Sequence, residues 1–205
     1  MKLHWSPRSP FVRKVMIVAH EIGIAGRLER VRTMAATTKP NAELMVDNPL
    51  SKLPTLVLDD GTALYDSPVI CEYFDTMHDG PKLLPAESGA RMTALRRQAL
   101  GDGMLDFLVL WRNENMRAAE HRSEPHVKSF SVRRDSVLAA LEKEAAALEA
   151  SAYSIGHIAL GVALSYLDFR FADYHWRKNH PRIAAWHKTF AARPAVQATE
   201  PVDDS

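Results

Sequence analysis

The sequence has very little cysteine and almost no net charge. Cys71 is the single cysteine among 205 residues, which excludes an internal disulfide, a zinc site built from several cysteines and a dithiol redox pair, and is typical of a reducing cytoplasm. The 26 basic and 25 acidic residues leave a formal charge of +1, so no overall field attracts nucleic acid or an anionic membrane. We expect neither as a partner.

Long apolar runs are also missing. The most apolar stretch, Ile155–Leu167, contains a histidine, a serine and two glycines, and it is shorter than the roughly 20 residues of a membrane span. The first residues include no apolar segment of signal-peptide length. With 46% hydrophobic and 25% charged residues, the composition is that of an ordinary globular protein. We therefore expect a soluble, cytoplasmic protein.

The composition changes part-way along the chain. Eight of the twelve prolines lie in residues 1–85, whereas residues 86–180 contain only Pro125 and are rich in alanine. The change falls in His78–Pro85, whose Asp-Gly-Pro start is typical of a loop. This pattern predicts a first domain at residues 1–80 and a helical domain at 86–200.

Turn residues and apolar periodicity predict an α/β first domain. Lys2–Trp5 suits a short strand, and Ser9-Pro10 begins a helix as N-cap and first residue. After a strand near Leu28–Val31, the Asp59-Asp60-Gly61 turn joins strands at 55–58 and 62–65, and Ser67-Pro68 begins another helix. The order is βαβ followed by ββα, with room for one helix between them. In the second domain the periodicity predicts helices at 90–120, 127–150, 155–176 and 182–192.

Ser9-Pro10-Phe11 is the first candidate for chemistry. It sets a hydroxyl at a helix N-terminus beside unpaired backbone N–H groups, and such a place favours an anion. The simpler interpretation is that Ser9 only caps the helix.

Two further features could complete a ligand site. Pro54 is either an ordinary first residue of a strand or a cis proline that turns the Leu53 backbone outward to pair with an extended peptide. Ser67 either caps the next helix or binds a carboxylate, while Asp66 binds an ammonium group. Two helix ends and one exposed backbone edge would suit a small acidic peptide.

Together these features resemble the glutathione transferase superfamily, in particular its bacterial serine-type members. The likeness extends over nearly the whole chain, through motifs in the right order: Ser-Pro-Phe-Val-Arg-Lys-Val at 9–15, Asn48-Pro49, Lys52-Leu53-Pro54, Leu64–Ser67, Ile158–Gly161 and Pro181–Trp186. The resemblance implies a thioredoxin-like domain with a four-stranded mixed sheet, followed by an all-α helical bundle, in a homodimer.

The resemblance also implies roles for individual residues. Ser9 would be the catalytic residue and would hydrogen-bond the sulfur of glutathione, the co-substrate. Leu53 would pair with the cysteinyl unit across cis Pro54, and Asp66 with Ser67 would hold the γ-glutamyl end. The other glutathione contacts would be Phe11 and Lys52. The pocket for the hydrophobic substrate, unless these residues are ordinary core, would be lined by Met104, Phe107 and Trp111.

Three features of the sequence qualify the resemblance. Ser6 could replace Ser9, although Pro7 biases Ser6 to extended backbone. Ser9 and Val12 stand where glutaredoxin-like relatives have two cysteines, so disulfide reduction is disfavoured. His157 stands where the family has a capping acid, which predicts a helix start weaker by about 1 kcal/mol.

Metal binding is not indicated. Neighbouring histidines in the helical part are five residues apart, as in His121 and His126, rather than the three or four that place two ligands on one helical face. The pairs Arg96-Arg97 and Arg133-Arg134 are typical of solvated helix faces, and Cys71 of a small buried hydrophobe.

Three functional hypotheses follow. The first is a detoxifying glutathione transferase that conjugates the glutathione thiolate to small hydrophobic electrophiles. The second keeps glutathione but performs dehalogenation, isomerisation or peroxide reduction. The third is a non-catalytic module for protein contacts, which the complete set of ligand groups disfavours.

Overall fold

The computed structural model describes residues 1–204, which form two compact units. The first unit comprises Met1–Ala86 together with residues 194–204, and the second comprises Glu87–Arg193. Residues 194–200, which were predicted to belong to the helical domain, therefore belong to the first unit. They join the first unit because helix α8 (Pro194–Gln197) packs against helix α1 (Pro10–Glu21).

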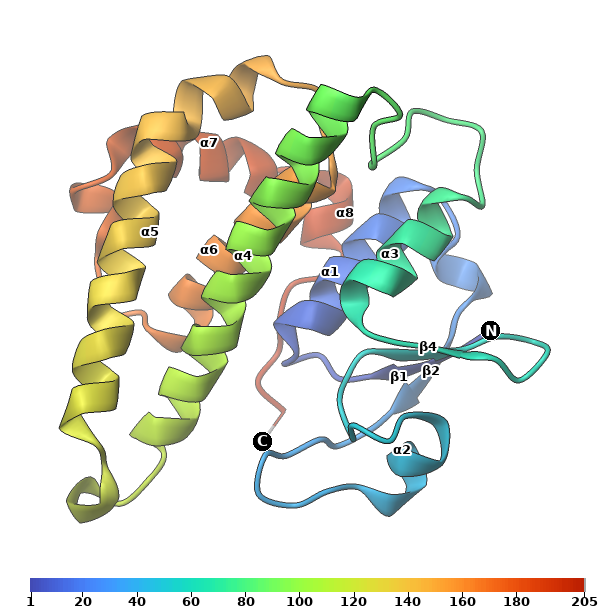
Figure 1. Cartoon of the computed structure of the whole chain (residues 1–205), viewed down its shortest axis with the longest axis horizontal. Helices are drawn as coiled ribbons and strands as arrows, with labels where there is room; N and C mark the ends of the chain where they lie inside the picture. The colour runs from blue at the N-terminus through green and yellow to red at the C-terminus, as the bar shows by residue number, and fades with distance from the viewer. Residues whose placement is uncertain (205) are drawn as a thin grey trace. The chain divides into compact units, whose positions relative to one another are not determined.

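The first unit is built on a four-stranded mixed sheet, as predicted. Its order is β2-β1-β3-β4, with β1 (Lys2–Trp5) parallel to β2 (Glu29–Arg32) and antiparallel to β3 (Thr55–Val57), which pairs with β4 (Ala63–Leu64). Helices α1 and α3 (Ser67–Asp75) lie on one face of the sheet, and α2 (Ala42–Asp47) lies beyond the other (Figure 1). The thioredoxin-like expectation is confirmed.

The second unit is helical, also as predicted. It contains α4 (Ser88–Asn115), α5 (Glu124–Ala150), α6 (Ile155–Arg170) and α7 (Pro181–Ala191), with single 3₁₀ turns at Ala119–His121 and Trp176–Lys178. Two helices end earlier than predicted. Helix α4 ends at Asn115 with Met116 as its C-cap. Helix α6 ends at Arg170 because the backbone of Phe171 is not helical, with φ −134° and ψ 48°.

Glycine sets how closely α4 approaches α6. A Cβ placed on Gly101 would lie 2.6 Å from the backbone carbon of Ala159, and one on Gly156 would lie 2.8 Å from the carbonyl oxygen of Ala94. Any larger residue would force the two backbones apart, because real Cβ atoms do not approach so closely. Glycine is a poor helix former, but Gly156 is required here by packing.

The prediction of a weak start to α6 rested on the absence of a capping acid at position 157. That reason is wrong, because His157 itself completes the cap. Nδ1 of His157 accepts from the backbone N–H of Ser154 at 3.1 Å, so the imidazole completes the capping box that an acid would otherwise complete. The proton then lies on Nε2, which donates to the carbonyl oxygen of Leu148 at 3.0 Å. Burial is the main cause that lowers the pKa of His157, so the ring is neutral at pH 7.

Of the arginines predicted to be solvated, Arg97 is buried and Arg134 is half-buried. Arg97 is 3% exposed and donates through Nε to Glu144 at 2.7 Å and through Nη1 to Ser151 at 2.8 Å. Burial would raise the pKa of Glu144, but hydrogen bonds from Arg97 and Arg96 outweigh it and lower the pKa. Arg134 lies over the ring of Tyr174, 3.4 Å from its centroid. Cys71 is buried, as expected.

Candidate functional site

Sheet register brings the three candidate segments to one end of the sheet. The carboxyl end of β1 leads to Ser9, and its residue His4 pairs with Thr55, the first residue of β3, directly after Pro54. Leu64, at the carboxyl end of β4, pairs with Leu56 and leads to Asp66 and Ser67. The three segments therefore lie at the same end of the sheet, although Ser9 and Ser67 are 58 positions apart in the sequence.

Ser9 caps α1 and keeps a hydrogen to donate. Its backbone is extended, and its Oγ accepts from the N–H of Val12 at 3.3 Å. Within residues 1–204 no group accepts the Ser9 O–H. A hydroxyl can accept and donate at once, so the capping and chemical interpretations of Ser9 are compatible. Ser6 is more buried, at 7% exposed, and its Oγ lies 3.4 Å from the backbone nitrogen of Arg8.

The loop before β3 holds Leu53 in place through a buried amide. Asn48 is 1% exposed and donates from Nδ2 to the carbonyl oxygen of Lys52 at 3.2 Å and to the hydroxyl of Thr55 at 2.9 Å. The Leu53–Pro54 peptide bond is cis, as expected. Neither backbone polar group of Leu53 has a partner in the described part of the chain. Both are therefore available to an extended peptide ligand.

Helix α3 begins one residue earlier than the sequence suggested. Asp66, not Ser67, is the N-cap, and the Tyr65–Asp66 peptide bond is cis. The Asp66 side chain is exposed, makes no capping bond, and has no ion-pair partner among residues 1–204. Ser67 is 1% exposed at the first turn, beside the unpaired N–H groups of the helix start. A carboxylate next to free N–H donors suits a zwitterionic amino-acid group.

In the second unit, two of the expected pocket residues belong to an aromatic cluster. Trp111 lies 4.9 Å from Phe171 and 6.1 Å from Phe130, measured between ring centroids, and Phe107 lies 6.5 Å from Phe130. Met104 is 1% exposed and packs within the core. The sequence analysis missed Phe130, Phe171 and the Arg134 side chain, which lies 5.2 Å from the Trp111 ring. Phe130 and Arg134 are four residues apart on one helical face, a spacing that could have linked them.

Comparison with known proteins identifies the family. Residues 8–77 match the glutathione S-transferase N-terminal domain, and residues 124–189 match the C-terminal domain. An uncharacterized GST-like protein of Escherichia coli, YibF, is 30% identical over 203 residues, 98% of each chain. The chain belongs to the glutathione S-transferase superfamily. Both halves of the superfamily fold are thus present in this member.

Two similar solved structures hold ligands. Both are of a glutathione transferase family member from Pseudomonas fluorescens Pf-5 and cover 98% of each chain. One, with bound glutathione, is 42% identical with a TM-score of 0.94. The other, with bound S-(propanoic acid)-glutathione, is 40% identical with a TM-score of 0.91. Two structures similar to this chain therefore hold glutathione and an S-substituted derivative of it.

Within residues 1–204 no group of three or more histidine, cysteine or acidic side chains is placed to hold a metal ion. Over the same range, every helix is too short or too polar to cross a bilayer.

Proposed function

We propose that this glutathione S-transferase conjugates the glutathione thiolate to small hydrophobic electrophiles, with Ser9 as the catalytic residue. The observation that supports this role is the geometry at the start of α1, where Ser9 accepts one helix N–H and keeps its O–H for a sulfur. In this reaction the thiolate attacks an electrophilic carbon, a C–S bond forms, and the leaving group or the electron pair of the attacked double bond departs from that carbon.

The energetic demand on Ser9 is modest. A thiol has a pKa of about 8.5, and lowering it by about two units needs roughly 2.7 kcal/mol of preferential stabilisation of the thiolate. One hydrogen bond to a charged acceptor contributes about 1.5 to 3 kcal/mol, and a helix N-terminus adds about 0.3 to 2 kcal/mol. The hydroxyl of Ser9 on its own helix is therefore sufficient in magnitude.

The remaining glutathione contacts follow from the free polar groups at the same end of the sheet. Leu53 offers an unpaired N–H and C=O to the cysteinyl unit, next to Pro54. Asp66 would bind the γ-glutamyl ammonium group, and Ser67 with the α3 N–H groups would bind its carboxylate. Two side chains beside these segments, Lys52 for the glycyl carboxylate and Phe11, complete the proposed set.

We place the electrophile beside the aromatic side chains of the second unit, with Phe107 and Trp111 as contacts and Met104 supporting them from the core. The relative with S-(propanoic acid)-glutathione supports a thioether product with a short alkyl group on the sulfur. We further propose a cytoplasmic homodimer that acts in detoxification, without a metal.

The experiment combines retention on immobilised glutathione with conjugation of a generic aryl chloride. We expect the parent protein to bind and react, and Ser9→Ala to bind but to lose at least about tenfold in rate. Ser6→Ala is the matched control and should react like the parent. If Ser6→Ala loses the rate instead, the catalytic assignment is wrong; if no protein binds glutathione, the proposed function is wrong. Identifying the product as a thioether separates conjugation from isomerisation or peroxide reduction.

A further inference from the structure

One buried histidine joins the two ends of the segment that carries helix α2. This segment, residues 33–47, leaves the sheet after β2 and returns to the loop before β3 (Figure 1). His4 on β1 is 6% exposed. Its Nδ1 lies 2.9 Å from the hydroxyl of Thr33, where the segment begins, and its Nε2 lies 2.8 Å from Oδ2 of Asp47, where the segment ends. The imidazole therefore ties both ends of the α2 segment to the central strand of the sheet.

The contact with Asp47 is a charge-assisted hydrogen bond. Hydrogen bonds from Lys2 and then from His4 lower the pKa of Asp47, so its carboxylate is ionised at neutral pH and Nε2 of His4 donates to it. The hydroxyl of Thr33 can donate or accept, so the contact with Nδ1 holds whichever partner carries the hydrogen. Nζ of Lys2 also donates to Asp47, but the Lys2 side chain is 37% exposed, against 8% for His4. Because water screens the exposed ion pair, His4 is the main anchor of Asp47.

The anchored end of the α2 segment leads directly to the backbone of Leu53. Asn48 follows Asp47 in the chain, is 1% exposed, and donates to the carbonyl oxygen of Lys52 and to the hydroxyl of Thr55. These two partners lie on either side of Leu53 in the sequence. A displacement of Asp47 would therefore move Asn48 and, through it, the residues that fix the Leu53 backbone.

We propose that His4 is a positioning residue for glutathione, which holds the α2 segment so that Leu53 faces the cysteinyl unit of the ligand. This inference rests on the proposed function, in which the N–H and C=O of Leu53 pair with that unit. A loop that is no longer held must be ordered when the ligand binds, and this ordering costs affinity. The proposed catalytic hydroxyl of Ser9 lies on another segment, where it caps α1. We therefore expect His4 to affect the affinity for glutathione and not the chemical step.

The experiment measures the Kd for glutathione by calorimetry, and kcat for an aryl chloride at saturating glutathione. His4→Phe keeps an aromatic ring but loses both polar contacts, so its Kd should rise about tenfold with kcat little changed. His4→Gln can still donate an amide N–H to Asp47, so its Kd should rise only about threefold. His20→Gln, at an exposed histidine in the last turn of α1, is the control and should bind like the parent.

Three outcomes would overturn the role of His4: a parental Kd in His4→Phe, a tenfold loss of kcat at saturating glutathione in that variant, or His4→Gln binding no better than His4→Phe. If the amide spectrum shows that His4→Phe does not fold, Asp47→Ala decides the question. That variant removes the same contact at a half-buried side chain, and its Kd should also rise about tenfold; a parental Kd there would refute the proposal.

The parent protein separates this proposal from the one on which it rests. A parent that binds no glutathione would overturn both. A parent that binds and conjugates glutathione, together with variants at His4 that bind equally well, would overturn the role of His4 alone.

Discussion

His157 is predicted to stabilise the second unit through its neutral imidazole. The side chain is 3% exposed and joins two backbone groups, the N–H of Ser154 and the C=O of Leu148. His157→Ala leaves the N–H of Ser154 without a partner, at about 1 to 3 kcal/mol, whereas the C=O of Leu148 keeps the hydroxyl of Ser151, 3.2 Å away. With about 1 kcal/mol more for the lost hydrogen bond to Leu148, we expect the free energy of unfolding to fall by roughly 2 to 4 kcal/mol. His157→Gln, whose amide oxygen can still accept from Ser154, should lose about half as much.

The same contacts predict a pH dependence with a definite sign. Because burial lowers the pKa of His157 in the folded protein, the unfolded chain binds a proton more readily. The contribution to stability is therefore complete above pH 6.5, the ordinary value. It decreases as the pH falls below that value, and levels off below the folded-state pKa.

Urea unfolding of the parent and of His157→Gln at pH 7.5 and at pH 5.5 measures this contribution. We expect the stability difference between the two proteins to shrink at the lower pH. His121→Gln, at an exposed histidine of the same unit, is the control and should track the parent at both values. A His157→Gln protein as stable as the parent at pH 7.5, or a difference that is the same at both values, would refute the reasoning.

The remaining predictions concern packing, one buried ion pair and ligand affinity. Gly101→Ala should lower the unfolding free energy by about 1 to 3 kcal/mol, because the new Cβ meets backbone atoms. Gly103→Ala, on the same helix, places its Cβ in open space and should raise the unfolding free energy by about 1 kcal/mol. Thermal unfolding checks the sign of both changes. Glu144→Gln should destabilise the protein by about 3 kcal/mol at neutral pH. Because the pKa of Glu144 is lowered in the folded protein, that loss of stability should fade as the pH falls below about 4.5. Arg96→Gln, at the exposed partner, should cost less than about 1 kcal/mol in the same denaturation series. Asp66→Asn should raise the KM for glutathione about tenfold with kcat little changed, and an unchanged KM would remove Asp66 from the proposed site.

Local signals allowed the fold and the site segments to be predicted. Capping and proline patterns mark helix starts within one turn, so the helices after Ser9 and Ser154 begin where the sequence indicates. The end of α4 was missed because residues 112–120 contain no glycine or proline and continue the helical pattern. The three candidate ligand-binding segments, around Ser9, Leu53 and Asp66, could be predicted because each is a run of adjacent residues.

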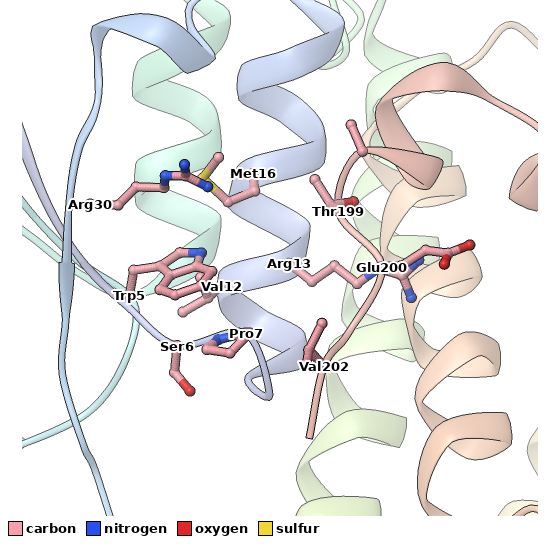
Figure 2. Close-up of a pocket in the computed structure, with 11 residues that line it drawn as sticks. Trp5, Ser6, Pro7, Val12, Arg13, Met16, Arg30, Thr199, Glu200 and Val202 are labelled. Carbon is pink, nitrogen blue, oxygen red and sulfur yellow. The ribbon is translucent and has the colours of Figure 1, made fainter. Parts of the chain in front are cut away.

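Long-range partners could not be predicted in the same way. Arg97 is read as solvated because its acid, Glu144, is 47 residues away. The placement of α8 with the first unit depends on its packing against α1, which no local pattern announces. A hollow beside Trp5 (Figure 2) is lined by residues from the end of β1, from α1, from β2 and from the C-terminal segment, and so from both ends of the chain. Tertiary contact, not propensity, decides each of these features.

The thiol pKa of bound glutathione tests the central proposal most directly. The ultraviolet absorbance of the thiolate, titrated with pH in the complex with the parent protein, should give a pKa about two units below the value of about 8.5 for a free thiol. In Ser9→Ala, with glutathione still bound, the pKa should return most of the way toward that value, and in Ser6→Ala it should not move. A bound thiol with the same lowered pKa in Ser9→Ala would contradict the assignment of Ser9.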